Sequence, residues 1–126
     1  MNSAIICFGS NIEPEKNAEK ARELLAKDQA LIATSAFLRT KPEGYSVQPD
    51  YLNGAFLIQT ELSFEALKTY LKGVENLMGR IRTTDKHAPR TIDLDIVVYN
   101  GKIISDDYLI YYFVKKSVDE LLPLLK

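Results

Sequence analysis

The alternation of aliphatic and acidic residues in TIDLDIVVY, residues 91–99, constrains the fold more than any other feature of the chain. Successive side chains of a strand point to opposite faces. One face of this segment therefore carries four aliphatic residues, Ile92, Leu94, Ile96 and Val98. The other face carries Asp93, Asp95, Val97 and Tyr99. Carboxylates are rarely buried without a partner, so we expect a sheet with one face covered by helices and one face open.

The rest of the chain predicts the other elements of such a sheet. Apolar runs bounded by turn residues predict three further strands, at residues 4–11, 30–40 and 51–60. Apolar residues at helical spacing predict one helix that begins near Pro14 and a second between Ser63 and Gly79. Polar loops are expected at residues 41–50 and 80–89.

The resulting order, β-α-β-β-α-β, predicts an α+β fold of the ferredoxin-like type. In that plan an antiparallel sheet carries both main helices on one face. Ser117 and Glu120 have the spacing of a capping box, which predicts a short C-terminal helix. The chain has 126 residues and no repeat or linker, so we expect a single domain over residues 1–126.

The open face of the predicted sheet brings polar side chains together. Strand parity places Leu52, Phe56 and Ile58 on the covered face, which leaves Tyr51 and Asn53 beside Asp93 and Asp95. Two carboxylates on one strand face repel each other unless a positive group lies between them. The spacing leaves two alternatives open: arginine-paired structural aspartates, with a partner such as Arg90, or ligands of Mg²⁺ shared with phosphate oxygens.

A basic loop precedes these aspartates and contains Arg80, Arg82, Lys86 and Arg90. Cations beside paired carboxylates are typical of phosphoryl transfer, although a solvated charged loop would have the same composition. His87 is the only histidine, which excludes a multi-histidine metal site. The chain has neither a P-loop nor the motifs of protein kinases.

Composition and charge limit the possible partners. The net charge of −1 argues against a general nucleic-acid binder, and aspartates on the open face would repel RNA phosphates. The single cysteine, Cys7, cannot form an internal disulfide. The sequence shows neither the basic start and apolar run typical of a signal peptide nor an apolar run of about 18 residues, so we expect neither a signal peptide nor a membrane span. We therefore expect a cytoplasmic protein without nucleic-acid or membrane partners, either a monomer or a weak homodimer.

The segment GRIRTTDKHAPRTIDLDIVVYNG, preceded by FGSN, RTKPEG and QPDYLNGAF, resembles the 6-hydroxymethyl-7,8-dihydropterin pyrophosphokinase family of folate biosynthesis. The resemblance covers about residues 5–109. It implies a ferredoxin-like fold and a Mg-dependent diphosphotransferase. Such an enzyme transfers pyrophosphate from ATP to the pterin hydroxymethyl group with two Mg²⁺ ions and releases AMP.

The resemblance also implies roles for individual residues, carried over by position. Asp93 and Asp95 would hold the metal ions and act in catalysis together with Arg80 and Arg90. The pterin pocket would be lined by five residues, Thr40, Pro42, Tyr51, Asn53 and Phe113. The nucleotide site would be lined by another five, Glu75, Arg82, His87, Arg90 and Ile96.

The chain departs from the family pattern after Leu109. The family continues with a Pro-His segment and then an arginine shortly before the phenylalanine that stacks on the pterin. Here LIYYFVKKSVDELLP aligns Phe113 with that phenylalanine only if the segment with the histidine and arginine is deleted. Lys115 and Lys116 fall on the wrong side of Phe113. We therefore expect a short form with a shortened C-terminal catalytic segment, either an active or a slowed pyrophosphokinase. The alternative is an impaired paralogue that binds pterin or nucleotide without turnover.

Overall fold

A computed structural model of the chain describes residues 1–41, 49–80 and 90–125. Within them an antiparallel sheet has six strands, β1 (Asn2–Ser10), β2 (Ala30–Thr34), β3 (Leu38–Thr40), β4 (Tyr51–Thr60), β5 (Asp93–Tyr99) and β6 (Lys102–Ile103). The strand order is β2-β4-β1-β5-β6, and β3 also pairs with β4. Three of the predicted site residues, Pro42, Arg82 and His87, lie outside the described residues.

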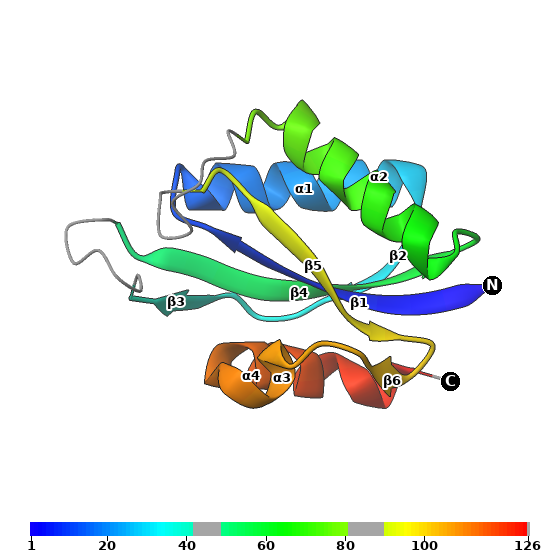
Figure 1. Ribbon diagram of the computed structural model, residues 1–126. Helices are drawn as coiled ribbons and strands as arrows, with labels where there is room; N and C mark the ends of the chain where they lie inside the picture. The colour runs from blue at the N-terminus through cyan, green and yellow to red at the C-terminus, as the bar shows by residue number, and fades with distance from the viewer. Residues whose placement is uncertain (42–48, 81–89, 126) are drawn as a thin grey trace.

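Helices cover both faces of the sheet, but unequally. The two longer helices, α1 (Pro14–Asp28) and α2 (Phe64–Leu77), lie on one face (Figure 1). The C-terminal elements lie on the other face and comprise α3 (Asp107–Ile110), α4 (Tyr112–Leu121) and a short 3-10 helix, η1 (Leu122–Leu124). The predicted α+β, ferredoxin-like class is confirmed. No helix in the described part of the chain has the length and apolar character needed to cross a bilayer.

Local signals in the sequence account for the two longer helices. Helix α1 begins at Pro14, where the fixed φ of proline suits a first helical turn. Helix α2 is capped by Ser63, whose Oγ accepts a hydrogen bond from the backbone N–H of Ala66 at 3.2 Å. Gly79, just after α2, has a φ of +87°, a backbone conformation that glycine adopts without steric cost.

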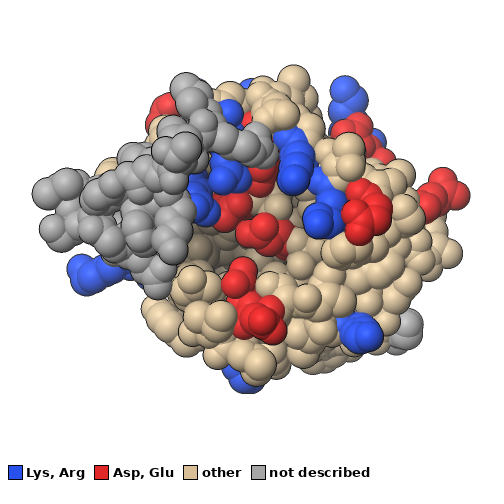
Figure 2. All heavy atoms as spheres, viewed as in Figure 1, with Lys and Arg blue, Asp and Glu red and all other residues tan. Residues whose placement is uncertain are grey.

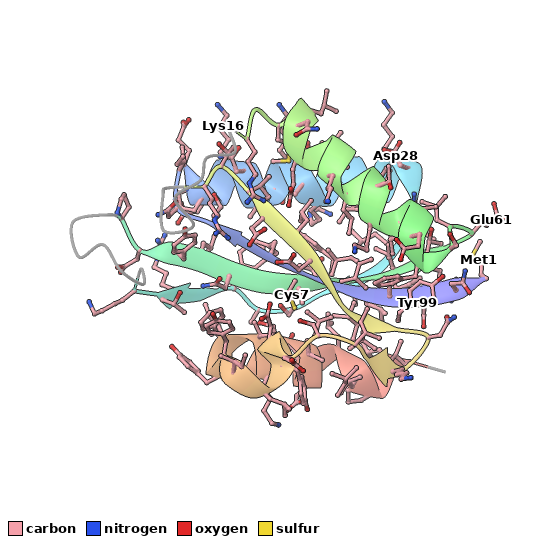
Figure 3. All side chains as sticks on the ribbon, in the orientation of Figure 1. Met1, Cys7, Lys16, Asp28, Glu61 and Tyr99 are labelled. Carbon is pink, nitrogen blue, oxygen red and sulfur yellow. The ribbon has the colours of Figure 1, made fainter. Side chains whose placement is uncertain are left out.

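The hydrophobic core has two parts, one on each face of the sheet. The larger part packs β1, β4 and β5 against α1 and α2, and its residues include Ile6, Phe8, Phe56, Leu67 and Leu94. The smaller part lies between the sheet and α4 and includes Ile5, Cys7, Leu57, Val97 and Val118. Figure 3 shows Cys7 on the side of the sheet that faces α4. The face expected to be open is therefore partly covered by the C-terminal helix.

A β-bulge changes the predicted faces at the end of β5. Ile6 pairs with Ile96 and Ile5 pairs with Val98, so Val97 is an extra residue in the ladder. The inserted residue reverses the parity beyond it. Val98 consequently packs on the α4 side and Tyr99 against the α1–α2 core, so the prediction for these two residues is wrong. The faces predicted for residues 93–97, which precede the change in parity, are unaffected.

The strand predicted at residues 30–40 is interrupted after Thr34. At the break the Ser35 N–H donates to the Ala55 carbonyl (2.9 Å), and the Ser35 Oγ accepts from the Ala55 N–H (2.8 Å). The next N–H, of Ala36, donates to both carboxylate oxygens of Glu120, at 3.1 Å each. The interruption therefore forms a junction between the sheet and α4.

That junction also corrects the predicted capping box. Helix α4 begins at Tyr112, so Ser117 lies inside it rather than at its N-terminus. The Ser117 side chain is buried, and its Oγ has no hydrogen-bond partner in the described part of the chain. Glu120 does not cap its own helix because it binds Ala36 in the sheet. The predicted C-terminal helix exists, but its N-cap is Tyr111 instead of Ser117, six residues earlier than the pattern indicated.

Candidate active site

Two cavities open beside β5 and share an acidic wall. The first has a volume of about 450 Å³ and the second about 400 Å³. Asp93 and Asp95 of β5 and Asp107 of α3 line both cavities. Figure 2 shows a hollow on this face with acidic side chains gathered in it and Lys and Arg side chains along its upper edge. Two ligands bound in these cavities would therefore meet at the three carboxylates.

The junction between β1 and β5 positions this wall. After β1, the side-chain Oδ1 of Asn11 accepts a hydrogen bond from the Arg90 N–H (2.8 Å), and the Asn11 N–H donates to the Arg90 carbonyl (3.1 Å). The Ser10 hydroxyl donates to the Thr91 carbonyl at 2.6 Å. The Ser-Asn turn signal thus fixes the backbone immediately before Asp93.

The first cavity combines aromatic and amide groups. Tyr51, Asn53 and Phe113 line it together with Thr40. The Nδ2 of the buried Asn53 donates a hydrogen bond to the Thr40 Oγ1 at 2.7 Å, which fixes the orientation of the amide. The Asn53 Oδ1 lies close to Gly9, where a Cβ would be only 3.1 Å away. Such a cavity can hold a flat ring with polar edges.

The second cavity lies between α2 and β5. Glu75, which is 4% exposed, joins the two elements. Its Oε2 accepts a hydrogen bond from the Leu94 N–H at 2.7 Å, and its Oε1 lies 3.0 Å from the Arg80 Nη1. Ile96 and Lys72 line the same cavity. This cavity offers both an apolar wall and several cations.

Asp93 is paired with arginines in this structure. Its Oδ1 accepts from the Arg80 Nη1 at 3.0 Å and its Oδ2 from the Arg90 Nη1 at 2.9 Å. The arginine-paired alternative is therefore found for Asp93. No described lysine or arginine forms an ion pair with Asp95, so the two aspartates have different environments.

Asp95 carries the strongest electrostatic perturbation in the site. Desolvation raises its pKa to about 7, and the neighbouring charges of Asp93, Asp107 and Glu75 act in the same direction. The side chain is still exposed to the cavity. This excess of negative charge, offered by hard oxygen donors, fits a divalent cation. The described residues contain no group of three or more His, Cys, Asp or Glu side chains arranged to hold a metal, so a cation here would take further ligands from a bound molecule or from water.

Asp107 was not predicted from the sequence. It belongs to α3, and burial together with the charge of Asp93 raises its pKa. Its neighbour Asp106 is exposed and lines neither cavity. Nothing in the pattern SDDY distinguishes the two aspartates, because the packing of α3 decides which one faces β5.

Cys7 also lines the first cavity. Burial, assisted by the charges of Asp95 and Asp107, raises the pKa of its thiol to about 12. A thiol with such a pKa is protonated at neutral pH and is a poor nucleophile. Cys7 therefore contributes to the wall of the cavity and to the core, as its apolar strand indicated.

The described candidate residues divide between the two cavities. Those predicted to bind the pterin, Thr40, Tyr51, Asn53 and Phe113, all line the first. Those predicted to bind the nucleotide, Glu75 and Ile96, line the second, together with Arg80. Arg90 lines the first cavity only. The roles themselves stay predictions.

Comparison with known proteins decides the family. A sequence model described as "7,8-dihydro-6-hydroxymethylpterin-pyrophosphokinase (HPPK)" matches residues 5–123. The chain belongs to this family. The resemblance seen in the sequence is confirmed at this level, and the match extends past Leu109 into α4.

Several curated pyrophosphokinases are similar to this HPPK-family chain. The 2-amino-4-hydroxy-6-hydroxymethyldihydropteridine pyrophosphokinase of Haemophilus influenzae is 38% identical over 112 residues, which is 86% of this chain and 69% of that protein. The Campylobacter jejuni protein of the same name is 36% identical over 126 residues, 96% of this chain and 80% of the relative. The Bacillus subtilis protein is 38% identical over 112 residues, with shares of 86% and 66%.

Proposed function

We propose that the protein transfers pyrophosphate from ATP to the hydroxymethyl group of 6-hydroxymethyl-7,8-dihydropterin and releases AMP. The observation that carries the proposal is the meeting of two cavities at Asp93, Asp95 and Asp107 in a chain of the HPPK family. In this reaction the pterin hydroxyl loses its proton and its oxygen bonds to the β-phosphorus. The bond from the β-phosphorus to the α,β-bridging oxygen breaks, and that oxygen leaves with AMP. Both reacting groups must therefore lie at one point, which the shared wall provides.

The first cavity is proposed as the pterin site. The Asn53 amide, held by Thr40, can bind the polar edge of the ring, and Tyr51 and Phe113 offer aromatic faces. Burial raises the pKa of the Tyr51 hydroxyl, with smaller opposing effects from nearby charges, so it remains a neutral donor. The hydroxymethyl group would then point toward Asp93 and Asp95.

The second cavity is proposed as the nucleotide site, with Asp93 and Asp95 as ligands of Mg²⁺. Two Mg²⁺ ions bound there would neutralise phosphate oxygens and polarise the phosphorus that is attacked. Arg80 and Arg90 form ion pairs with Asp93 at the shared wall. When ATP binds, both guanidinium groups would exchange Asp93 for phosphate oxygens. Glu75 keeps Arg80 beside β5 during that exchange.

A catalytically impaired paralogue is the alternative, and one observation favours it. Only Ile110, Tyr111 and Tyr112 separate Leu109 from Phe113, and none of them is cationic. Lys115 does not compensate, because its Nζ pairs with Asp119 at 2.6 Å and lies 5.2 Å from the Tyr108 ring centroid. Losing cations that stabilise a transition state costs orders of magnitude in rate. Binding of pterin or nucleotide without turnover is therefore the second candidate.

One experiment separates these two candidates. The protein is incubated with ATP, Mg²⁺ and 6-hydroxymethyl-7,8-dihydropterin, AMP formation is followed, and each ligand is titrated by calorimetry. Binding of both ligands with AMP formation supports the enzyme, and binding without AMP supports the paralogue. Binding of neither ligand sinks both. Asp95→Ala should abolish binding of Mg-ATP, and unchanged affinity would make Asp95 a structural residue.

We also propose that this single-domain protein is a monomer or a weak homodimer, which sedimentation equilibrium tests.

A further inference from the structure

Two lysines of α2, Lys68 and Lys72, line the second cavity. Lys68 and Lys72 are exposed, and neither forms an ion pair with a described residue. Residues four apart lie on the same side of a helix, where two like charges repel each other and weaken the helix. An anion bound between them and β5 would reverse the sign of that interaction.

The direction of Lys68 is defined by its contact with Phe64. The Lys68 Nζ lies 5.6 Å from the centroid of the Phe64 ring, and Phe64 lines the same cavity. Lys72 is one turn further along α2, toward Glu75 and Arg80. The cations therefore follow the wall of the cavity from its apolar part toward the carboxylates of β5.

The charge of the cavity indicates what these cations do. A phosphate chain that approaches Asp93 and Asp95 is repelled by their carboxylates, and part of the positive charge of Arg80 is already offset by Glu75 and Asp93. Cations on the opposite wall are free of such pairing among the described residues. They would hold the anion from the side that a metal on β5 does not reach.

We propose that Lys68 and Lys72 bind the phosphate chain of the nucleotide, and that α2 thereby supplies positive charge that residues 110–112 do not carry. The inference rests on the proposed nucleotide site in the second cavity. If the two lysines bind phosphate, their contribution to affinity depends on the number of phosphates in the ligand. A contact to the base or the ribose would instead be insensitive to the number of phosphates.

The test is calorimetric titration with the Mg²⁺ complex of α,β-methylene-ATP, which cannot be cleaved at the reacting bond, and with AMP and adenosine. The proteins are wild type, Lys68→Gln, Lys72→Gln and the double variant. Lys20→Gln, on the exposed side of α1, is the matched control for loss of one positive charge. The double variant should bind the methylene analogue roughly 10- to 100-fold more weakly, because hydrogen bonds to charged groups contribute most. Its affinity for adenosine should stay within about twofold of wild type, and its salt dependence should be smaller.

Three results overturn or separate the proposals. A double variant that binds the analogue within about twofold of wild type, as Lys20→Gln should, overturns the role of the lysines. An equal loss for adenosine overturns it too, because the contact would then be to the nucleoside. Wild-type protein that binds the analogue but forms no AMP from ATP and pterin contradicts the proposed enzyme and leaves the lysine inference standing. Thermal melting of each variant checks that the fold is intact.

Discussion

Asp95→Asn should stabilise the metal-free protein while it removes cation binding. In the folded chain desolvation and the charges of Asp93, Asp107 and Glu75 raise the pKa of Asp95 from 3.8 to about 7. The ionised side chain is therefore held in an unfavourable place, as is common for residues whose position serves a ligand. Asparagine has nearly the same shape and carries no charge.

The size of the effect follows from that change in pKa. Each unit is worth about 1.36 kcal/mol, so a rise of about 3 units corresponds to about 4 kcal/mol at full strength. Asp95 is exposed to the cavity, and water screens the repulsion, so we expect about 1–2 kcal/mol. For a domain of this size the gain raises Tm by roughly 3–10 °C.

The sign depends on pH. The folded pKa of Asp95 lies above the value of 3.8 for the free carboxyl. Its contribution to wild-type stability is therefore fully present below about pH 4 and is lost as the pH rises to about 7. The advantage of Asp95→Asn should accordingly be small at pH 4, grow up to pH 7 and stay constant above it.

The assay is thermal and urea unfolding in EDTA at several pH values between 4 and 8. Asp106→Asn, one residue from Asp107 but outside both cavities, controls for the loss of a negative charge and should change stability by less than about 0.5 kcal/mol. Added Mg²⁺ should raise the Tm of wild type but not that of Asp95→Asn. Two results refute the reasoning. One is an Asp95→Asn variant that is no more stable than wild type at pH 8, and the other is a gain in stability that has the same size at pH 4 and at pH 8.

Three further changes test other parts of the site. Glu75→Ala should lower the free energy of unfolding in urea by about 2–4 kcal/mol, because the buried Leu94 N–H loses its acceptor. Glu75→Gln keeps an acceptor and should recover part of this loss, so an equal loss for the two variants would contradict the argument. Asn53→Ala should weaken pterin binding in calorimetry by roughly 10-fold or more while leaving nucleotide affinity within about twofold. Glu120→Ala should cost about 1–2 kcal/mol in thermal unfolding, because the Ala36 N–H loses its carboxylate partner; an unchanged Tm would mean that this contact is incidental.

The sequence was most informative where one local rule decides the outcome. Alternation in TIDLDI separated Ile92, Leu94 and Ile96 from Asp93 and Asp95 because each face of a strand repeats every two residues. Pro14 and Ser63 marked the starts of helices for equally local reasons. The class of fold then followed from the order of the elements.

Features that depend on tertiary packing were not predictable in this way. The bulge at Val97 has no glycine or proline to mark it, and its effect on Val98 and Tyr99 appears only when β5 is paired with β1. The local pattern indicates a capping role for Glu120 within its own helix. Its contact with Ala36 joins residues 84 positions apart, so no local pattern predicts it. Asp107 lines both cavities through the placement of α3, which packs against α4.

The shared acidic wall makes the two cavities thermodynamically dependent on each other. Asp93, Asp95 and Asp107 face both, so a cation that offsets their charge for a ligand in one cavity also lowers the repulsion felt in the other. Linkage requires the effect to be mutual: the factor by which the first ligand raises affinity for the second equals the factor in the opposite order. Cooperative binding of two different molecules can thus arise in this small sheet from a common set of charges, without a hinge or a second conformation of the chain.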